Sequence, residues 1–242
     1  MDQSRCRHCA ALPAAGAGFG RTFNPIFMDS LMPPTAASVR LDIIRHGEPV
    51  GGKRYRGDKI DDPLSPQGWA QMQARIAQRA LAGRDDWTAI VSSPLKRCRE
   101  FAEHLAAERN LPLVIDPNLR ERGFGIWEGL TFEQVRQRYP DDYRQHKENP
   151  AHHMPEGGEA IDAFYPRIAQ AMAQHARAHA ARNGHALLII GHAVMMRTAA
   201  VWALKAPLST IGLVDTEYAS LLSLRWRGEQ AQLIGLSNDI AT

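Results

Sequence analysis

Short apolar segments recur along the chain from residue 39 onward. Four of them are rich in β-branched and other aliphatic residues, and they predict buried strands at residues 39–44, 88–91, 113–115 and 186–190. Two later segments, 218–226 and 231–236, flank Arg227-Gly228-Glu229, a sequence that favours the tight turn of a β-hairpin. The last two strands are therefore expected to be antiparallel neighbours.

Amphipathic segments separate these strands and predict helices at residues 66–82, 95–109, 132–138, 159–182 and 194–204. Ser65 suits the N-cap of the first helix, Pro66 its first position and Gly83 its end. Pro166 implies a kink or a later start for the fourth helix. Three segments are expected to be irregular: 49–62, 139–158, and 119–127, for which a short strand is the alternative.

This alternation of strand and helix predicts one α/β domain over residues 38–242. We expect a three-layer α/β/α sandwich whose mostly parallel central sheet has one antiparallel edge strand, contributed by the late hairpin. Residues 1–37 are rich in Ala, Gly and Pro and lack a coherent apolar stretch. They are expected to form a flexible N-terminal extension without a catalytic role.

The composition adds limits on the class of partner. Of 242 residues, 44% are hydrophobic and 23% are charged, as in ordinary globular proteins. The formal net charge of +3 is spread along the chain, which argues against nucleic acid or a membrane surface as a partner. No run approaches the ~20 apolar residues of a membrane span. A small anionic substrate is compatible with this balance.

The cysteines point to a reducing compartment. Cys6, Cys9 and Cys98 provide no disulfide framework, so we expect a cytoplasmic protein. Cys6 and Cys9 have the spacing of a metal knuckle or a redox pair, but no second cysteine pair follows them. We expect no metal or redox centre there, and we expect Cys98 to be a buried helix residue.

Polar side chains follow the predicted strands at their carboxyl ends, where open α/β sheets bind their ligands. His46 comes directly after the first strand, and His192 comes directly after the apolar strand at 186–190. Another strand end leads into a helix that carries Arg97, and Glu121 follows the third strand after a short loop. We expect these four residues to meet at one face of the domain.

These residue types suit phosphoryl transfer. A neutral imidazole such as His46 can attack phosphorus and form a covalent phosphohistidine. Arg45 and Arg97 can bind the phosphoryl oxygens through planar donors, and His192 can add further hydrogen bonds. Glu121 is the candidate donor of a proton to the leaving oxygen and the later acceptor of a proton from water.

Six segments, in sequence order over about residues 39–205, resemble the histidine phosphatase superfamily, which also contains cofactor-dependent phosphoglycerate mutases. They are Arg45-His46-Gly47-Glu48, Asp62-Pro63-Leu64-Ser65-Pro66-Gln67-Gly68, Ser92-Ser93-Pro94-Leu95-Lys96-Arg97, Leu119-Arg120-Glu121 with Phe124-Gly125-Ile126-Trp127-Glu128-Gly129, Gly157-Gly158-Glu159, and Gly191-His192. The tetrapeptide alone would be a weak signal, whereas the ordered set is specific.

The resemblance implies a phosphoglycerate mutase-like fold and assigns the roles. His46 is then the nucleophile, Arg45, Arg97 and His192 form the phosphate pocket, and Glu121 is the acid. The family's usual arrangement implies that the carbonyl group of the residue after the nucleophile, here Gly47, orients the imidazole. No metal and no cofactor are implied.

The chain also departs from the family. Many relatives have an Asn on the phosphate six residues after the nucleophile, where this chain has Gly52. Either Lys53, Arg54 or Arg56 replaces that contact, or the pocket has fewer donors. Many relatives also have Gly where this chain has Ala193.

Two further segments bear on the substrate. The short stretch between Glu121 and Glu159 lacks the longer basic insert of the mutases, which favours a phosphatase. The run 48–57 resembles α-ribazole phosphatase-like members of the family. We therefore predict a phosphomonoester hydrolase acting on a small phosphorylated metabolite.

Several alternatives stay open. Arg54, Arg56, Gly57 and His153 are expected to face the substrate, although His153 also fits an exposed loop. Glu128 competes with Glu121 for the role of the acid. His175 and His179, four apart, suit a metal or a partly solvated helix face, and the second is favoured. A phosphoglycerate mutase-type phosphotransferase and a non-catalytic phosphate-binding protein are the alternative functions, and a homodimer stays open because one sequence shows no interface.

Overall fold

The computed structural model describes residues 38–240 of the chain. The expectations for residues 1–37, including the pair Cys6 and Cys9, lie outside the described residues. The strands are β1 (Val39–Arg45), β2 (Ala89–Ser92), β3 (Leu113–Ile115), β4 (Ala186–Gly191), β5 (Leu221–Arg227) and β6 (Gln230–Ser237). The α-helices are α1 (Pro66–Leu81), α2 (Lys96–Arg109), α3 (Phe132–Arg138), α4 (Pro140–Glu148), α5 (Ile161–Ala180) and α6 (Ala193–Leu204). Short 3-10 helices span η3 (Pro117–Leu119), η4 (Gly125–Trp127) and η5 (Leu208–Leu213).

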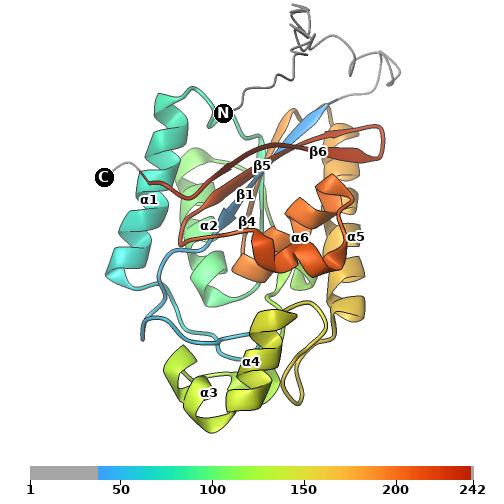
Figure 1. Cartoon of the computed structure of the whole chain (residues 1–242). Helices are drawn as coiled ribbons and strands as arrows, with labels where there is room; N and C mark the ends of the chain where they lie inside the picture. Colours follow the sequence, from blue (N-terminus) through green and yellow to red (C-terminus); the bar gives the residue numbers. More distant parts are fainter. Residues whose placement is uncertain (1–37, 241–242) are drawn as a thin grey trace, which may run out of the picture. The chain divides into compact units, whose positions relative to one another are not determined.

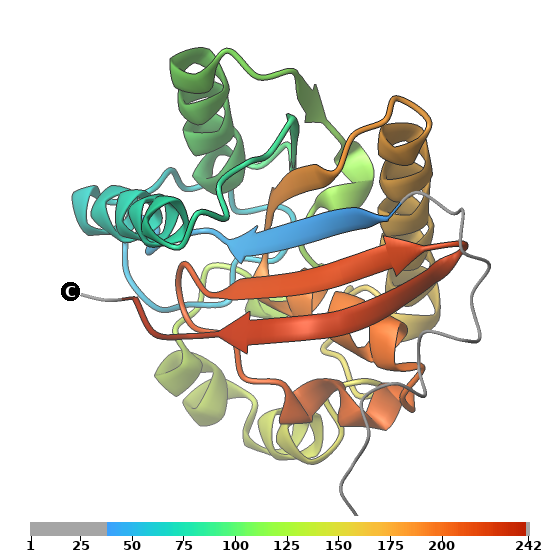
Figure 2. The same ribbon diagram turned by 90° about the horizontal axis from the view of Figure 1, so that it is seen from above.

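Within the described residues, the strands form one sheet in the order β3-β2-β4-β1-β5-β6. The pairs β3–β2, β2–β4 and β4–β1 are parallel, whereas β5 is antiparallel to both of its neighbours. The predicted α/β class with a mostly parallel sheet is confirmed, with one refinement. The antiparallel strand β5 lies between β1 and β6 and is one strand in from the edge (Figure 2).

Two hydrophobic layers cover the faces of the sheet. On one face, Leu41 and Ile43 of β1 share a buried cluster with side chains of α5 and α6. On the other face, Ile44 shares a cluster with Met72 of α1 and Phe101 of α2. In Figure 1 the pair α1 and α2 and the pair α5 and α6 flank the sheet, so the predicted three layers are present.

Local signals set the ends of most elements. The Ser65 hydroxyl accepts a hydrogen bond from the backbone N–H of Gly68 at 3.0 Å and caps α1 as predicted. Asn110, in the left-handed region at φ 51°, ends α2. Gly228 and Glu229 both have positive φ in the turn between β5 and β6, the conformation of a tight hairpin turn.

Two helices differ from the sequence-based expectation. The fourth predicted helix starts later, at Ile161, and still contains Pro166. Helix α4 lies within a segment that was expected to be irregular. Among its residues only His146 is buried, so α4 presents no periodic apolar stripe for sequence reasoning to detect.

Helices α3 and α4 contact each other and form a pair below the sheet in Figure 1. Three buried side chains, Phe124, Trp127 and Val135, form a small cluster at this helix pair together with Tyr55 and Tyr143. This pair and the segment that follows β1 therefore build a layer beyond the carboxyl end of β1. Within residues 38–240, no helix combines the length and the apolar character needed to cross a membrane.

Candidate active site

The two predicted histidines lie side by side because their strands are parallel neighbours. In the register of β1 and β4, Arg45 pairs with Gly191, so the residues that follow, His46 and His192, leave the sheet together. Their ring centroids are 5.3 Å apart in an edge-to-face arrangement. The sheet therefore brings together two residues that are distant in sequence.

The environment of His46 leaves one ring nitrogen free to attack. Its Nδ1 lies 2.7 Å from the carbonyl oxygen of Gly47, as the family resemblance implied. A carbonyl oxygen only accepts, so Nδ1 carries the proton. Burial, and then the nearby charges of Arg97 and Arg45, hold the pKa of His46 well below its ordinary value. The ring is therefore neutral near pH 7, and its Nε2 presents a lone pair.

Arg45 and Arg97 both lie close enough to His46 for their charges to act on it, and they line the same cavity. Arg45 donates to the carbonyl oxygen of Thr216 at 2.7 Å. Arg97 donates to the carbonyl oxygens of Gly57 and Ile60, each at 2.8 Å. The Nε atoms of both arginines are buried without a hydrogen-bond partner among residues 38–240. Buried donors of this kind suit a phosphoryl group.

His192 lies deeper than His46 and is fully buried. Its Nε2 is 2.7 Å from the hydroxyl oxygen of Ser93, and its ring also contacts the sulfur of Cys98. Burial, followed by the charge of Arg97, lowers the pKa of His192 well below the ordinary value. Cys98 is a buried residue of α2, as expected.

Glu121 lines the same cavity, and its carboxylate is anchored at both oxygens. Oε1 accepts from the backbone N–H of Arg122 at 2.9 Å, and Oε2 accepts from the backbone N–H of Val194, at the start of α6, at 3.2 Å. The competitor Glu128 instead accepts from the backbone of Phe124 and Lys59 and is not among the lining residues. The geometry therefore favours Glu121 over Glu128 as the acid.

The cavity encloses about 640 Å³. One wall is aromatic, since Tyr55 packs against the rings of Phe124 and Phe132 at centroid distances of 4.9 and 4.8 Å. Charged side chains of both signs also line it: the cations include Lys53, Arg54, Arg56, Lys147 and Arg197, and the anions include Glu148, Asp215 and Glu217. A phosphorylated compound larger than its phosphate group would fit this combination.

The residues expected to face the substrate behave differently. Arg54, Arg56 and Gly57 line the cavity, although the guanidinium of Arg56 already pairs with Asp62 at 2.9 Å. His153 is not among the lining residues and lies 3.4 Å from Asp142. His146 of α4 lines the cavity instead, with its Nδ1 2.7 Å from the His153 carbonyl oxygen.

Sequence reasoning missed part of the wall. Tyr218 stacks on the guanidinium of Arg45 at 4.3 Å and lies 5.9 Å from the ring of His46. Arg197 donates to the Thr216 hydroxyl at 3.1 Å and also lines the cavity. Tyr218 had been placed in a strand, but β5 begins three residues later, and no local signal marks it.

The two histidines at metal-like spacing have separate partners. His175 lies 2.7 Å from Asp116, whereas the Nε2 of His179 lies 2.9 Å from the Thr88 hydroxyl and 3.0 Å from the Ala186 carbonyl oxygen. Across residues 38–240, no group of three or more His, Cys, Asp or Glu side chains is placed to hold a metal ion.

Comparisons with known proteins find phosphatases among the relatives of the chain. The chain is 32% identical over 163 residues to phosphoserine phosphatase 1 of Hydrogenobacter thermophilus, covering 66% of this chain and 73% of that protein. Three mycobacterial relatives, each 30% identical over 200 residues, are longer, and the chain spans 53% of their length.

Solved structures share the fold. The native structure of a mycobacterial glucosyl-3-phosphoglycerate phosphatase is 25% identical with a TM-score of 0.71, covering 84% of this chain and 100% of that one. The α-ribazole phosphatase of Shigella flexneri is 24% identical with a TM-score of 0.70, covering 84% and 99%. At that identity the second likeness shows the fold alone.

Residues 41–239 match the histidine phosphatase superfamily, branch 1, which spans the whole site described above. The phosphatase names of the relatives are those of phosphoric monoester hydrolases. The chain therefore belongs to the histidine phosphatase superfamily, branch 1.

Proposed function

We propose that the chain hydrolyses a phosphomonoester of a small metabolite through a covalent phosphohistidine on His46, without a metal. The contact between His46 Nδ1 and the Gly47 carbonyl oxygen, at 2.7 Å, carries this proposal. It leaves a neutral Nε2 facing a cavity that also holds Arg45, Arg97 and Glu121.

In the first step, Nε2 of His46 attacks phosphorus and the bond from phosphorus to the ester oxygen breaks. Glu121, in its protonated form, gives its proton to the leaving oxygen. Arg45 and Arg97 bind the equatorial oxygens, where negative charge gathers in the transition state.

In the second step, water attacks the phosphohistidine and gives a proton to the Glu121 carboxylate. The bond between phosphorus and Nε2 breaks, which restores neutral His46 and releases inorganic phosphate. His192 was expected in the phosphate pocket, but it is fully buried and is not among the residues that line the cavity. Its ring lies 5.3 Å from that of His46, so it supports both steps as a fixed neighbour of the nucleophile.

The cavity of about 640 Å³ and its aromatic wall favour a substrate whose leaving group is larger than the phosphate itself. An α-ribazole phosphate-like compound is the narrower expectation from the loop after His46. A panel of this compound, phosphoserine, glucosyl-3-phosphoglycerate and sugar phosphates tests it. We still predict that the chain has no nucleic acid or membrane partner and that it is cytoplasmic. A homodimer stays open.

Turnover of p-nitrophenyl phosphate with EDTA present tests the reaction. We expect wild-type activity with EDTA and a loss of at least about 10³-fold in His46→Ala. His104→Ala, at an exposed position of α2, is the control and should behave as wild type. An inactive wild type, or a fully active His46→Ala, would contradict the proposal. Mutase activity is scored separately with 3-phosphoglycerate and bisphosphoglycerate.

A further inference from the structure

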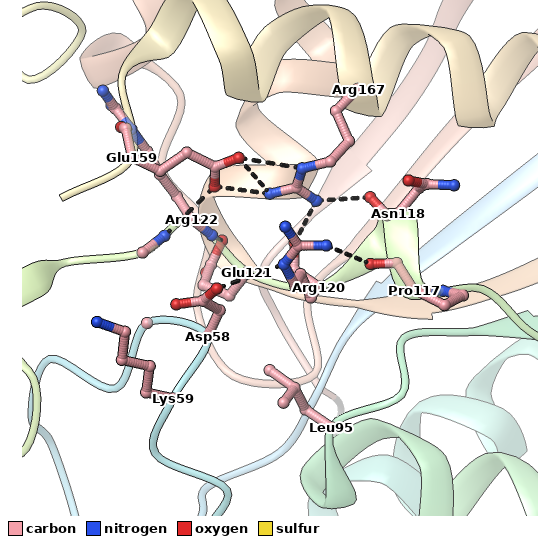
Figure 3. Close-up of polar contacts among 12 residues, drawn as sticks. Asp58, Lys59, Leu95, Pro117, Asn118, Arg120, Glu121, Arg122, Glu159 and Arg167 are labelled. Atoms are coloured by element: carbon pink, nitrogen blue, oxygen red, sulfur yellow. Dashed lines mark hydrogen bonds and ion pairs between the residues drawn. The ribbon is translucent and has the colours of Figure 1, made fainter. Parts of the chain in front are cut away.

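Arg167, in the second turn of α5, donates hydrogen bonds from all three nitrogens of its guanidinium to other residues of the protein. Its Nε and Nη2 donate to the carboxylate of Glu159 at 2.7–3.1 Å (Figure 3). Its Nη1 donates to the carbonyl oxygens of Asn118 at 2.6 Å and Arg120 at 3.1 Å. All three guanidinium nitrogens thus donate within the protein, and Arg167 is not among the residues that line the cavity. Arg167 therefore acts on the reaction through the residues it holds.

The contacts of Arg167 lie on both sides of Glu121. Asn118 and Arg120 precede Glu121 in the chain, so Nη1 fixes the main chain before it. Beyond Glu121, the backbone N–H of Glu159 donates to the Gly123 carbonyl oxygen at 2.9 Å. The Arg167–Glu159 pair thus connects α5 to the main chain before and after the acid.

A second arginine, Arg122, holds the main chain that follows Glu121. Arg122, next to Glu121, donates to the carbonyl oxygens of Glu159, Pro150 and Ala151 at 2.8–2.9 Å. Burial lowers its pKa to about 10, so it stays charged at neutral pH. Glu121 therefore lies in a segment whose main chain is held by hydrogen bonds at several residues. Arg167 makes the hydrogen bonds to the residues that precede Glu121.

We propose that Arg167 is a positioning residue for the general acid: together with Glu159 it holds the main chain around Glu121 so that the carboxyl group meets the leaving oxygen. This inference rests on the proposed function. A general acid raises the rate of a reaction about 10²- to 10⁴-fold, and displacing a reacting group by on the order of 1 Å lowers the rate about 10²-fold. Loss of Arg167 therefore removes much of the contribution of Glu121 while His46 and its arginines stay in place.

The dependence on the leaving group separates this role from a general structural one. Nitrophenolate leaves as a stable anion and needs little protonation, whereas an alkoxide needs the acid. The ratio kcat/KM reports the step in which the leaving group departs. We expect Arg167→Met to lower kcat/KM for glycerol 2-phosphate about 10- to 100-fold and for p-nitrophenyl phosphate less than about threefold.

The experiment measures kcat/KM for p-nitrophenyl phosphate, phenyl phosphate and glycerol 2-phosphate in the full chain. In Arg167→Met and in Glu121→Gln, kcat/KM should fall more steeply than in wild type as the leaving group becomes more basic. The double variant should be no steeper than Glu121→Gln alone, because Arg167 acts through Glu121. Arg167→Lys keeps the charge that also acts on the pKa of His192 but loses the planar fork, so it should share the steeper dependence.

The matched control is Arg177→Met, on the same helix. Arg177 also makes an ion pair with a glutamate, Glu229, but at an exposed position away from Glu121. Arg177→Met should leave kcat/KM for all three substrates at the wild-type value. Equal losses on every substrate in Arg167→Met, or a wild-type dependence in Arg167→Lys, would overturn the inference. A wild type without turnover would instead overturn the proposed function.

Discussion

Gly47 and Gly68 lie in direct backbone contact. A Cβ on Gly47 would come within 2.1 Å of the Gly68 carbonyl oxygen, and a Cβ on Gly68 within 2.0 Å of the Glu48 carbonyl oxygen. Helix α1 therefore packs against the segment that carries the Gly47 carbonyl group, which orients His46. The position of His46, the proposed nucleophile, depends on this close approach.

Gly68→Ala should displace that segment, because the atoms it meets belong to the backbone and cannot rotate away. We expect a loss of about 1–3 kcal/mol in the free energy of unfolding and a drop of about tenfold or more in kcat/KM. Urea unfolding and p-nitrophenyl phosphate turnover measure both. Gly235→Ala is the control, since a Cβ there meets nothing within 4 Å. Unchanged activity in Gly68→Ala would contradict the assigned role of the contact.

Arg97→Lys should weaken phosphate binding although it keeps the charge. A lysine cannot reproduce the fork that donates to Gly57 and Ile60 at 2.8 Å and still present donors to the phosphoryl group. Loss of one or two charged hydrogen bonds predicts a fall of about 10- to 100-fold in kcat/KM. The inhibition constant of inorganic phosphate should rise as well. Arg109→Lys, also on α2, is the control, because Arg109 pairs with Asp85 on the surface.

Asp42, buried in the centre of β1, should be a major source of stability. Its carboxylate accepts from Arg79, Trp87 and Ser223 at 2.6–2.9 Å and from Arg40 at 3.0 Å. Asp42→Ala removes the shared carboxylate of two half-buried arginines and leaves the N–H of the buried Trp87 without this acceptor, so we expect a loss of about 3–5 kcal/mol in urea unfolding. Asp86→Ala removes the more exposed partner of Arg40 and should cost at most about 1 kcal/mol. Similar costs for both variants would contradict this view.

The stability of the domain should fall in mild acid because of His46 and His192. Their pKa values lie well below the ordinary value of about 6.5, chiefly because both rings are buried and next because Arg97 is near. Unfolding restores ordinary pKa values, so below about pH 6.5 the unfolded chain binds more protons than the folded one. Stability is then full above that pH and declines by up to about 1.4 kcal/mol per pH unit for each ring.

Urea unfolding at about pH 7.5 and about pH 5.5 measures this decline. His192→Gln should show a smaller difference between the two conditions than wild type, since one buried ring no longer takes up a proton. His104→Gln, at an exposed position, should keep the wild-type difference. A decline that is identical in all three proteins would argue that other groups control the acid sensitivity.

Much of the site could be predicted because its residues follow strand ends. The apolar runs mark β1 and β4, and the residues after them, His46 and His192, need only a parallel pairing to meet. Ser65 and Asn110 end or begin helices through contacts within a few residues. Such short-range signals are present in the sequence itself.

The rest of the site depends on contacts between distant residues. Arg45 and Thr216 are 171 positions apart in the sequence, and Arg167 and Asn118 are 49 positions apart, so no local pattern predicts either contact. Helix α4 and its His146 also escaped prediction, because a helix that buries one side chain has no apolar period. The sequence by itself determined the α/β class and pointed to His46, the proposed nucleophile, and its first partners, since apolar periodicity and strand ends are local. Only the tertiary structure decided which main chain holds Glu121 and which side chains line the cavity, because those positions arise when separate elements pack together.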